Sequence, residues 1–162
     1  MITIDRFHDR LSYDMETGLF VWKKGRGPVS EGKVAGRPNV HGYIRIGLDG
    51  RDYLAHRLAW FVVHGEWPNG EIDHINGCIT DNRICNLRVA TREENCRNVK
   101  VHKRNRLGIK GVSERNDCKK RFGAKIRING KVVALGQYET ADEAKAAYNE
   151  AAREHFGEFF RE

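Results

Sequence analysis

An aspartate and a histidine stand side by side at Asp73 and His74, in the stretch EIDHINGCITDNRICNLRVATREEN (71–95). Hydrolysis of a phosphodiester bond needs a base that deprotonates water, a cation that absorbs charge at phosphorus, and side chains that position both. Asp73 can supply an anionic oxygen, His74 a neutral imidazole near physiological pH, and Asn95 a second oxygen ligand. These residue types at this spacing are compatible with metal-assisted chemistry on a phosphodiester.

Four asparagines follow the Asp-His pair, and asparagine is uncommon inside helices and strands because its amide competes for local backbone hydrogen bonds. They are Asn76, Asn82, Asn86 and Asn95. Taken singly, each of these residues is typical of a surface turn, and only their joint pattern favours a site. Adjacent strand residues point to opposite faces, so a regular strand would separate Asp73 from His74, and a shared metal requires a bend or bulge.

The surrounding sequence predicts the order strand, loop, strand, helix. EIDHI and CNLRV are short strand candidates joined by the turn-rich NGCITDNRI, and Thr91 with Glu94 forms a capping box that starts a helix containing Asn95. Upstream, short strands are expected at 19–24 and in a hairpin over 42–55 that turns at Asp49-Gly50. A buried helix over 55–65 follows. In it, His56 is expected to be a capping or core residue, and Arg57 is a candidate phosphate contact that nothing in the sequence requires.

The stretch resembles the HNH endonuclease motif of the ββα-metal fold, in particular the variant of phage and intron homing endonucleases that reads D-H-I-x-G…N-x-x-x-N-L…E-N. The matching residues are Asp73-His74-Ile75-Asn76-Gly77, Asn82, Asn86-Leu87 and Glu94-Asn95. HRLAW (56–60) and GEWPNGEIDH (65–74) are also similar to that family.

This resemblance implies that His74 is the general base and that Asp73 and Asn95 hold a single metal ion. It also implies that Asn86 is the central asparagine that pins the loop and orients His74. The family often has histidine where this chain has Asn95, although the homing subgroup also uses asparagine. Two oxygen ligands suit Mg²⁺ or Mn²⁺ better than zinc, so the expected cofactor is one divalent ion of that kind.

The charge of the 162-residue chain is unevenly distributed: residues 1–91 carry a net +1, residues 92–131 carry +10, and residues 132–162 carry −4. A basic run of this kind is either a solvated linker or a surface for a polyanion such as DNA. The four cysteines, Cys78, Cys85, Cys96 and Cys118, form no C-x-x-C pair, so free thiols are favoured over metal ligands.

Residues 108–162 predict a second module. Strands are expected at 108–115 and in a hairpin over 121–138 that turns at Asn129-Gly130, followed by a helix with a capping box at Thr140. An apolar stripe of that helix is expected at Ala144, Ala147, Tyr148, Ala151, His155 and Phe156. One face of strand 121–128 is apolar, and the other carries Arg121, Lys125 and Arg127. That basic face either lies in a DNA groove or is an ordinary solvated face of an antiparallel sheet.

The second module is similar to the apetala-two/ethylene-response-factor type of DNA-binding domain, which is attached to some phage HNH endonucleases. The matching segments are GIKGVSER, the A-x-I-R of 124–127, LGQY, TADEAKAAYNEAA and His155-Phe156-Gly157. The resemblance implies DNA contacts from Arg115, Lys125 and Arg127. Ser113 and Ala134 replace residues that the plant domains use, so the target sequence of those domains does not transfer.

We therefore expect an α+β protein: an HNH module of the ββα-metal fold at 1–98, a basic linker at 99–107, and a three-stranded antiparallel sheet packed on one helix at 108–162. The expected function is metal-dependent hydrolysis of double-stranded DNA. A DNA-binding regulator with a decayed nuclease module is the alternative, and an RNA-binding protein is a third class, although that would favour base-stacking aromatics on the exposed sheet face. No apolar run is long enough to span a membrane, and a cytoplasmic location is expected, in a bacterial host if a phage encodes the protein.

Overall fold

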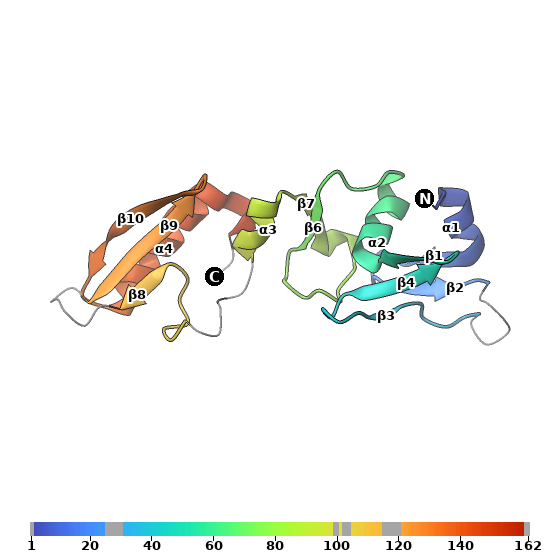
Figure 1. The fold of residues 1–162 in the computed structure, drawn as a ribbon, viewed down its shortest axis with the longest axis horizontal. Helices are drawn as coiled ribbons and strands as arrows, with labels where there is room; N and C mark the ends of the chain where they lie inside the picture. The colour runs from blue at the N-terminus through green and yellow to red at the C-terminus, as the bar shows by residue number, and fades with distance from the viewer. Residues whose placement is uncertain (1, 25–30, 99–100, 102–104, 115–120, 161–162) are drawn as a thin grey trace. The chain divides into compact units, whose positions relative to one another are not determined.

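The computed structural model describes residues 2–24, 31–98, 101, 105–114 and 121–160. The chain divides into two compact units, Met1–Asn95 and Cys96–Glu162, each described here by itself (Figure 1). Both combine helices with small antiparallel sheets, which confirms the predicted α+β class. The division falls within helix α3 (Arg92–Asn98), and most of the predicted linker lies outside the described residues.

The first unit begins with a helix that was not predicted from the sequence, since only strands were expected before residue 55. Helix α1 (Ile4–Arg10) starts at the N-cap Thr3, whose hydroxyl oxygen accepts a hydrogen bond from the Arg6 amide at 3.3 Å. Two turns of helix are too short to be stable alone, and packing supplies the missing stability because Phe7 is completely buried. Strand β1 (Leu11–Tyr13) follows directly and pairs with β2 (Phe20–Trp22).

A second antiparallel sheet has the order β3-β4-β5, with β3 at Arg37–Pro38, β4 at Ile44–Leu48 and β5 at Arg51–Leu54. The predicted turn between β4 and β5 is confirmed, and both of its central residues have positive φ, 51° at Asp49 and 77° at Gly50. Helix α2 (Ala55–His64) ends, as predicted, at Gly65 in the left-handed conformation. The largest fully buried side chains of this unit are Phe7, Leu11, Ile46, Leu48 and Leu58.

The predicted order of strand, loop, strand and helix is present at the end of this unit. Strand β6 (Glu71–His74) pairs with β7 (Leu87–Ala90), and the loop between them ends in the short 3₁₀ helix η1 (Ile84–Asn86). Helix α3 follows β7 directly. Thr91 and Glu94 form the predicted capping box: the Glu94 carboxylate accepts from the Thr91 amide at 2.8 Å, and the Thr91 hydroxyl oxygen accepts from the Glu94 amide at 3.3 Å.

The second unit is a three-stranded antiparallel sheet with a helix packed on it. Its strands are β8 (Val112–Glu114), β9 (Phe122–Ile128) and β10 (Lys131–Tyr138), in the order β10-β9-β8. The β9–β10 turn has positive φ at Asn129 and Gly130, as predicted. Strand β8 is shorter than the predicted 108–115. Helix α4 (Ala141–Phe156) and the 3₁₀ helix η2 (Gly157–Phe159) complete the unit.

Helix α4 packs on the sheet through a narrower stripe than the sequence suggested. Its buried residues are Ala144, Ala152 and Phe156, whereas His155 is exposed and was wrongly included in the predicted apolar stripe. The reason is geometric: the residues that face the sheet follow 144, 148, 152 and 156, one every fourth residue, and this row omits position 155. Within the described residues, no helix is long and apolar enough to cross a membrane.

Candidate active site

Strands β6 and β7 hold the Asp-His pair. Their pairing keeps one register from Glu71 opposite Ala90 to His74 opposite Leu87, so there is no bulge between Asp73 and His74. Both side chains are nevertheless buried, with 3% of Asp73 and 4% of His74 exposed. Because the strand is regular, they belong to opposite faces of β6, and each has its own set of neighbours.

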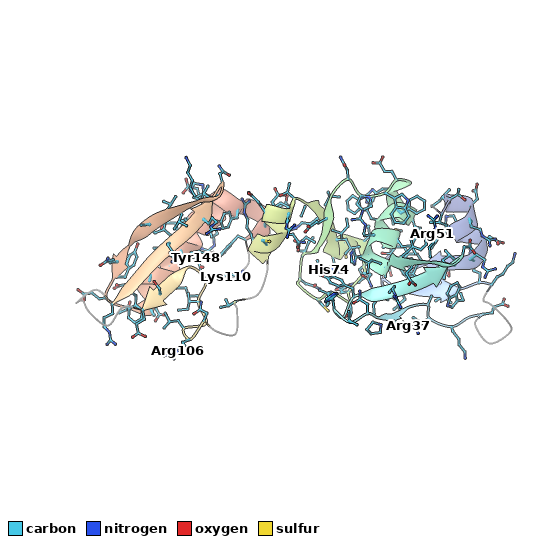
Figure 2. All side chains as sticks on the ribbon, viewed as in Figure 1. Arg37, Arg51, His74, Arg106, Lys110 and Tyr148 are labelled. Carbon is cyan, nitrogen blue, oxygen red and sulfur yellow. The ribbon has the colours of Figure 1, made fainter. Side chains whose placement is uncertain are left out.

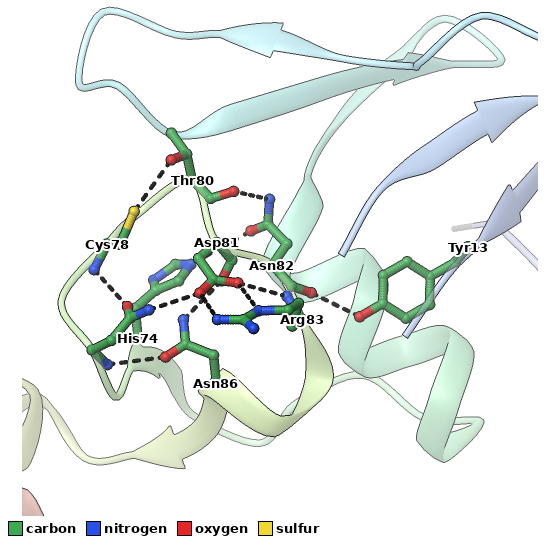
Figure 3. A network of polar contacts seen from close by, with 9 residues as sticks. Tyr13, His74, Cys78, Thr80, Asp81, Asn82, Arg83 and Asn86 are labelled. Carbon is green, nitrogen blue, oxygen red and sulfur yellow. Dashed lines mark hydrogen bonds and ion pairs between the residues drawn. The ribbon is translucent and has the colours of Figure 1, made fainter. Parts of the chain in front are cut away.

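The His74 ring lies between helix α2 and the loop that follows β6 (Figure 2). Its Nε2 is 3.4 Å from Oδ1 of Asn82, whose amide nitrogen donates to the Thr80 carbonyl at 3.2 Å (Figure 3). On the other side, the His56 ring packs edge-on at 5.0 Å between centroids, and the Tyr43 ring lies at 6.1 Å. A polar loop and two aromatic rings therefore enclose the imidazole.

Burial sets the charge of both histidines. It lowers the pKa of His74 below its ordinary value, although the Asn82 hydrogen bond and the charges of Asp73 and Asp81 act in the opposite direction. Burial, with a smaller contribution from His74, lowers the pKa of His56 to about 3. Both rings are consequently neutral at neutral pH, and a neutral imidazole is the form that can accept a proton.

Asn86 holds the loop between β6 and β7 together (Figure 3). Its side-chain oxygen accepts from the Asn76 amide at 2.9 Å, and its side-chain nitrogen donates to the Asp81 carbonyl at 2.8 Å. Its own carbonyl accepts from the Ile75 amide at 2.9 Å. Asn86 thus ties the start of the loop to its end, whereas the asparagine whose side chain is placed against the His74 ring is Asn82.

The same loop is attached to the N-terminal part of the unit. The Tyr13 hydroxyl donates to the Asn82 carbonyl at 2.7 Å. Gly18, with φ of +71°, approaches so closely that a Cβ there would lie 2.5 Å from the Arg83 nitrogen. Arg83 in turn forms an ion pair with Asp81 at 2.6 Å. The sequence offered no signal for these contacts, because they join segments far apart in the chain.

On the other face of β6, Asp73 is paired with its cross-strand neighbour Arg88. The Nε and Nη2 atoms of Arg88 donate to Oδ2 of Asp73 at 2.9 and 2.7 Å, and both side chains are largely buried. Asn95 on α3 donates from its side-chain nitrogen to the Glu71 carboxylate at 2.6 Å. Glu71 precedes Asp73 by two residues and shares its face, so Asn95 reaches the face of β6 that carries Asp73.

The residues on this face fit a hard divalent cation. A carboxylate from Asp73 and an amide oxygen from Asn95 are the donor types that Mg²⁺ and Mn²⁺ prefer. The Asn95 amide nitrogen is engaged by Glu71, which leaves the oxygen as the end of the amide suited to an ion. Among the described residues, no group of three or more His, Cys, Asp or Glu side chains could hold a metal ion, so a site here would have to complete its coordination with water and substrate oxygens.

Arg57, a candidate phosphate contact in the sequence, makes structural hydrogen bonds in the folded unit. Its guanidinium donates to the carbonyls of Gly70 at 2.8 Å and Pro68 at 3.3 Å, and so holds the turn that leads into β6. His56 at the start of α2 is a core residue, as expected, but it also packs directly against His74. Cys78, Cys85 and Cys96 are free and exposed, and Cys118 lies outside the described residues.

Strand β9 of the second unit presents the predicted basic face. Lys125 and Arg127 are exposed, while Ala124 and Ile126 between and beside them are buried. Arg121 forms an exposed ion pair with Glu114 at 3.0 Å, so its charge is partly compensated within the sheet. The remaining residue of the predicted DNA-binding set, Arg115, lies outside the described residues.

Comparisons with known proteins concern the region around the candidate active site. Residues 53–97 match the family model described as HNH endonuclease. The chain is 32% identical over 106 residues to "Uncharacterized HNH endonuclease L560" of Acanthamoeba polyphaga mimivirus, covering 64% of this chain and 54% of that protein. It is 41% identical over 59 residues to "Protein 3.8" of Escherichia phage T7, covering 36% of this chain and 49% of that protein. The chain thus spans about half the length of these curated relatives.

No solved structure matches the chain. The matched segment runs from β5 to α3 and contains every residue of the candidate active site that the sequence singled out: Asp73, His74, Asn86 and Asn95. Residues 53–97 of this protein are therefore similar to the HNH endonuclease family.

Proposed function

We propose that the protein is an HNH endonuclease that hydrolyses phosphodiester bonds of double-stranded DNA with one divalent metal ion, Mg²⁺ or Mn²⁺. The observation that carries this proposal is the buried His74, whose pKa is lowered by burial and which lies in the segment that matches the HNH endonuclease family. At neutral pH this ring is a neutral base.

In the proposed reaction, His74 accepts a proton from the water that attacks phosphorus. Asp73 and Asn95 would hold the metal ion, in a ββα-metal arrangement of β6, β7 and α3. Because His74 is the last residue of β6, the substrate phosphate would have to bind at this end of the strand to meet both the metal ion and the His74 ring. A divalent cation held by these two residues would neutralise charge that develops on the phosphate and on the leaving 3′ oxygen. Arg88 holds the Asp73 carboxylate in place through two hydrogen bonds, and Asn86 keeps the loop closed around His74.

We assign DNA binding to the second unit, as a domain of the apetala-two/ethylene-response-factor type. Its support is the one-sided basic face of β9, where exposed Lys125 and Arg127 stand opposite a buried apolar face. Arg121 and Arg115 would extend this face. Side chains on such a strand can reach phosphates and base edges in a DNA groove, so this unit would retain DNA near the nuclease.

A non-catalytic DNA-binding regulator is the alternative function. It would require a decayed nuclease module, yet Asp73, His74 and Asn95 are all present, and the first two are buried beside polar partners, Asp73 with Arg88 and His74 with Asn82. The matching relatives come from a virus and a phage, which supports a virus-encoded enzyme that acts on DNA in the cytoplasm of its host.

The first test measures plasmid cleavage. The wild-type protein is expected to nick or cut supercoiled DNA in Mg²⁺, and His74→Ala is expected to lower the rate by about 10²- to 10⁴-fold, the usual contribution of a general base, with DNA affinity unchanged. His8→Ala, which removes an exposed histidine on α1, is the matched control. Undiminished turnover by His74→Ala would exclude this residue as the base.

The second test concerns the metal. Activity is expected to disappear in EDTA and to return with Mg²⁺ or Mn²⁺. Mn²⁺ binding by the free protein, followed by water-proton relaxation, is expected to weaken in Asp73→Asn and in Asn95→Ala. Full activity in chelator, restoration by Zn²⁺ alone, or unchanged Mn²⁺ binding in both variants would contradict the proposed site.

The third test concerns the basic face of β9. Lys125→Ala with Arg127→Ala is expected to weaken DNA binding and to reduce the slope of log affinity against log salt by about 0.9 for each phosphate that the variant no longer neutralises. Lys145→Ala, which removes an exposed lysine from α4, is expected to leave the slope unchanged. Identical salt titrations for wild type and double variant would show that β9 only faces solvent.

A further inference from the structure

Asn82 lies between the His74 ring and the N-terminal hairpin. Its carbonyl accepts a hydrogen bond from the Tyr13 hydroxyl at 2.7 Å, and its side-chain oxygen lies 3.4 Å from Nε2 of His74 (Figure 3). The side-chain nitrogen donates to the Thr80 carbonyl at 3.2 Å. One short residue therefore connects β1, the loop after β6 and the proposed base.

The orientation of the Asn82 amide determines which nitrogen of His74 carries the proton. Because the amide nitrogen is turned toward the Thr80 carbonyl, the end that faces His74 is the oxygen, which can only accept. A hydrogen bond between the two side chains then requires the proton on Nε2 of His74, which places the lone pair of the neutral ring on Nδ1. A base that is fixed in one tautomer and one orientation needs less rearrangement to accept a proton from water.

Tyr13, which hydrogen-bonds to the Asn82 carbonyl, is itself held in place by the core. Its ring packs on Phe20 at 4.7 Å between centroids, and Phe20 is a core residue with 2% exposure. Burial raises the pKa of the Tyr13 hydroxyl to about 12, so the hydroxyl remains a donor at any working pH. Since the asparagine side chain has only two rotatable bonds, a shift of its backbone carries over to the amide that contacts His74.

We infer that Tyr13 and Asn82 are positioning residues of the nuclease site: Tyr13 fixes the backbone of Asn82, and the Asn82 side chain fixes the ring orientation and tautomer of His74. This inference rests on the proposed function of His74. It adds Tyr13, on the β1–β2 hairpin, to a proposed site whose other residues lie within 53–97. It also gives the two asparagines different roles: Asn86 joins the two ends of the loop, and Asn82 orients His74.

The kinetic test is a double-mutant cycle on DNA cleavage with Tyr13→Phe, Asn82→Ala and the double variant. Asn82→Ala is expected to lower kcat by about 10- to 100-fold, the scale of a small misplacement of a catalytic group, with little change in KM. Tyr13→Phe is expected to lower kcat by about 2- to 10-fold, in line with the removal of one hydrogen bond. If Tyr13 acts through Asn82, its substitution has no further effect in the Asn82→Ala background; effects that multiply would overturn the inference.

A conservative variant separates holding the base from holding the loop. Asn82→Asp keeps an oxygen that can accept from His74 but has no donor for the Thr80 carbonyl. It is expected to retain most of the kcat that Asn82→Ala loses. If Asn82→Asp is as slow as Asn82→Ala, the side chain serves only as a tie to the Thr80 carbonyl, and the inference fails.

A spectroscopic measurement is independent of cleavage. In ¹H–¹⁵N correlation spectra of the free protein, the His74 ring nitrogens are expected to report the Nε2–H tautomer in wild type and in Asn82→Asp, and to move toward a tautomer mixture in Asn82→Ala. Tyr13→Phe is expected to shift the same signals. Two control variants are expected to leave the tautomer unchanged. Tyr53→Phe alters a tyrosine whose ring stacks on Trp67. Asn76→Ala removes the hydrogen bond from the Asn76 side chain to the Asp81 carboxylate in the same loop. An unperturbed His74 signal in Asn82→Ala would refute the inference even if the wild-type protein cleaves no DNA.

Discussion

Replacing His56 by leucine is expected to make the first unit less sensitive to acid. His56 is 5% exposed, and its Nδ1 has no hydrogen-bond partner among the described residues. Burial lowers its pKa from 6.5 to about 3, so the folded protein keeps this ring neutral over a pH range in which the unfolded chain takes up a proton. Leucine has a similar volume and no titrating group.

The sign and size follow from proton linkage. Between pH 7.5 and 5.5 the unfolded state binds a proton at His56 and the folded state does not, so the free energy of unfolding decreases as pH falls, by about 1.4 kcal/mol from this residue alone. The decrease continues toward pH 3, where the folded state also becomes protonated. His56→Leu lacks this contribution, and its stability should decrease by about 1.4 kcal/mol less over the same two pH units. A buried nitrogen without a partner costs about 1–3 kcal/mol, so leucine is not expected to destabilise the protein at pH 7.5.

Urea titrations followed by tryptophan fluorescence can measure this difference. The three tryptophans of the chain, Trp22, Trp60 and Trp67, all lie in the first unit, so the signal reports the unfolding of that unit. The free energy of unfolding is measured for both proteins at pH 7.5, 6.5 and 5.5. A second apolar replacement, His56→Met, controls for the shape of the new side chain. Parallel pH dependences of wild type and both variants would refute the reasoning.

Three further substitutions test other contacts. Gly18→Ala is expected to lower the free energy of unfolding of the first unit by more than 1 kcal/mol in the same titration, because its Cβ would meet the loop backbone at 2.5 Å. The control is Gly32→Ala, where φ is similar and no atom lies within 4 Å of the Cβ, and it should lower that free energy by less. Arg88→Met is expected to lower the free energy of unfolding of the metal-free protein by about 3–5 kcal/mol, because it removes one partner of a buried ion pair. Adding Asp73→Asn removes the other charge and should restore part of that free energy. A double variant as unstable as Arg88→Met would contradict this. Gly111→Ala would press a Cβ into the ring of a tyrosine on α4, so circular dichroism should show the second unit unfolding at lower urea while the tryptophan transition stays in place.

Turns and helix ends were predictable from the sequence because each depends on a few adjacent residues. The hairpins at Asp49–Gly50 and Asn129–Gly130 need two consecutive positive φ values, which these dipeptides adopt at low cost. Gly65 ends α2 in the left-handed conformation, and Thr91 and Thr140 accept from the first turns of their helices. The short helix α1 was missed because its stability comes from burial of its apolar face and not from local signals.

The identity of the candidate site residues could also be read from the sequence, since Asp73, His74 and Asn95 lie at a recognisable spacing. Their partners could not. Tyr13 is 69 residues from Asn82, and the rings of His56 on α2 and His74 on β6 meet only in the folded unit. Such contacts form when distant segments pack together, so the local sequence around either residue does not predict them. The sequence by itself therefore determined which side chains could do the chemistry. The tertiary structure decided how deeply they are buried, that the His74 ring is neutral at neutral pH, and which residues hold them in place.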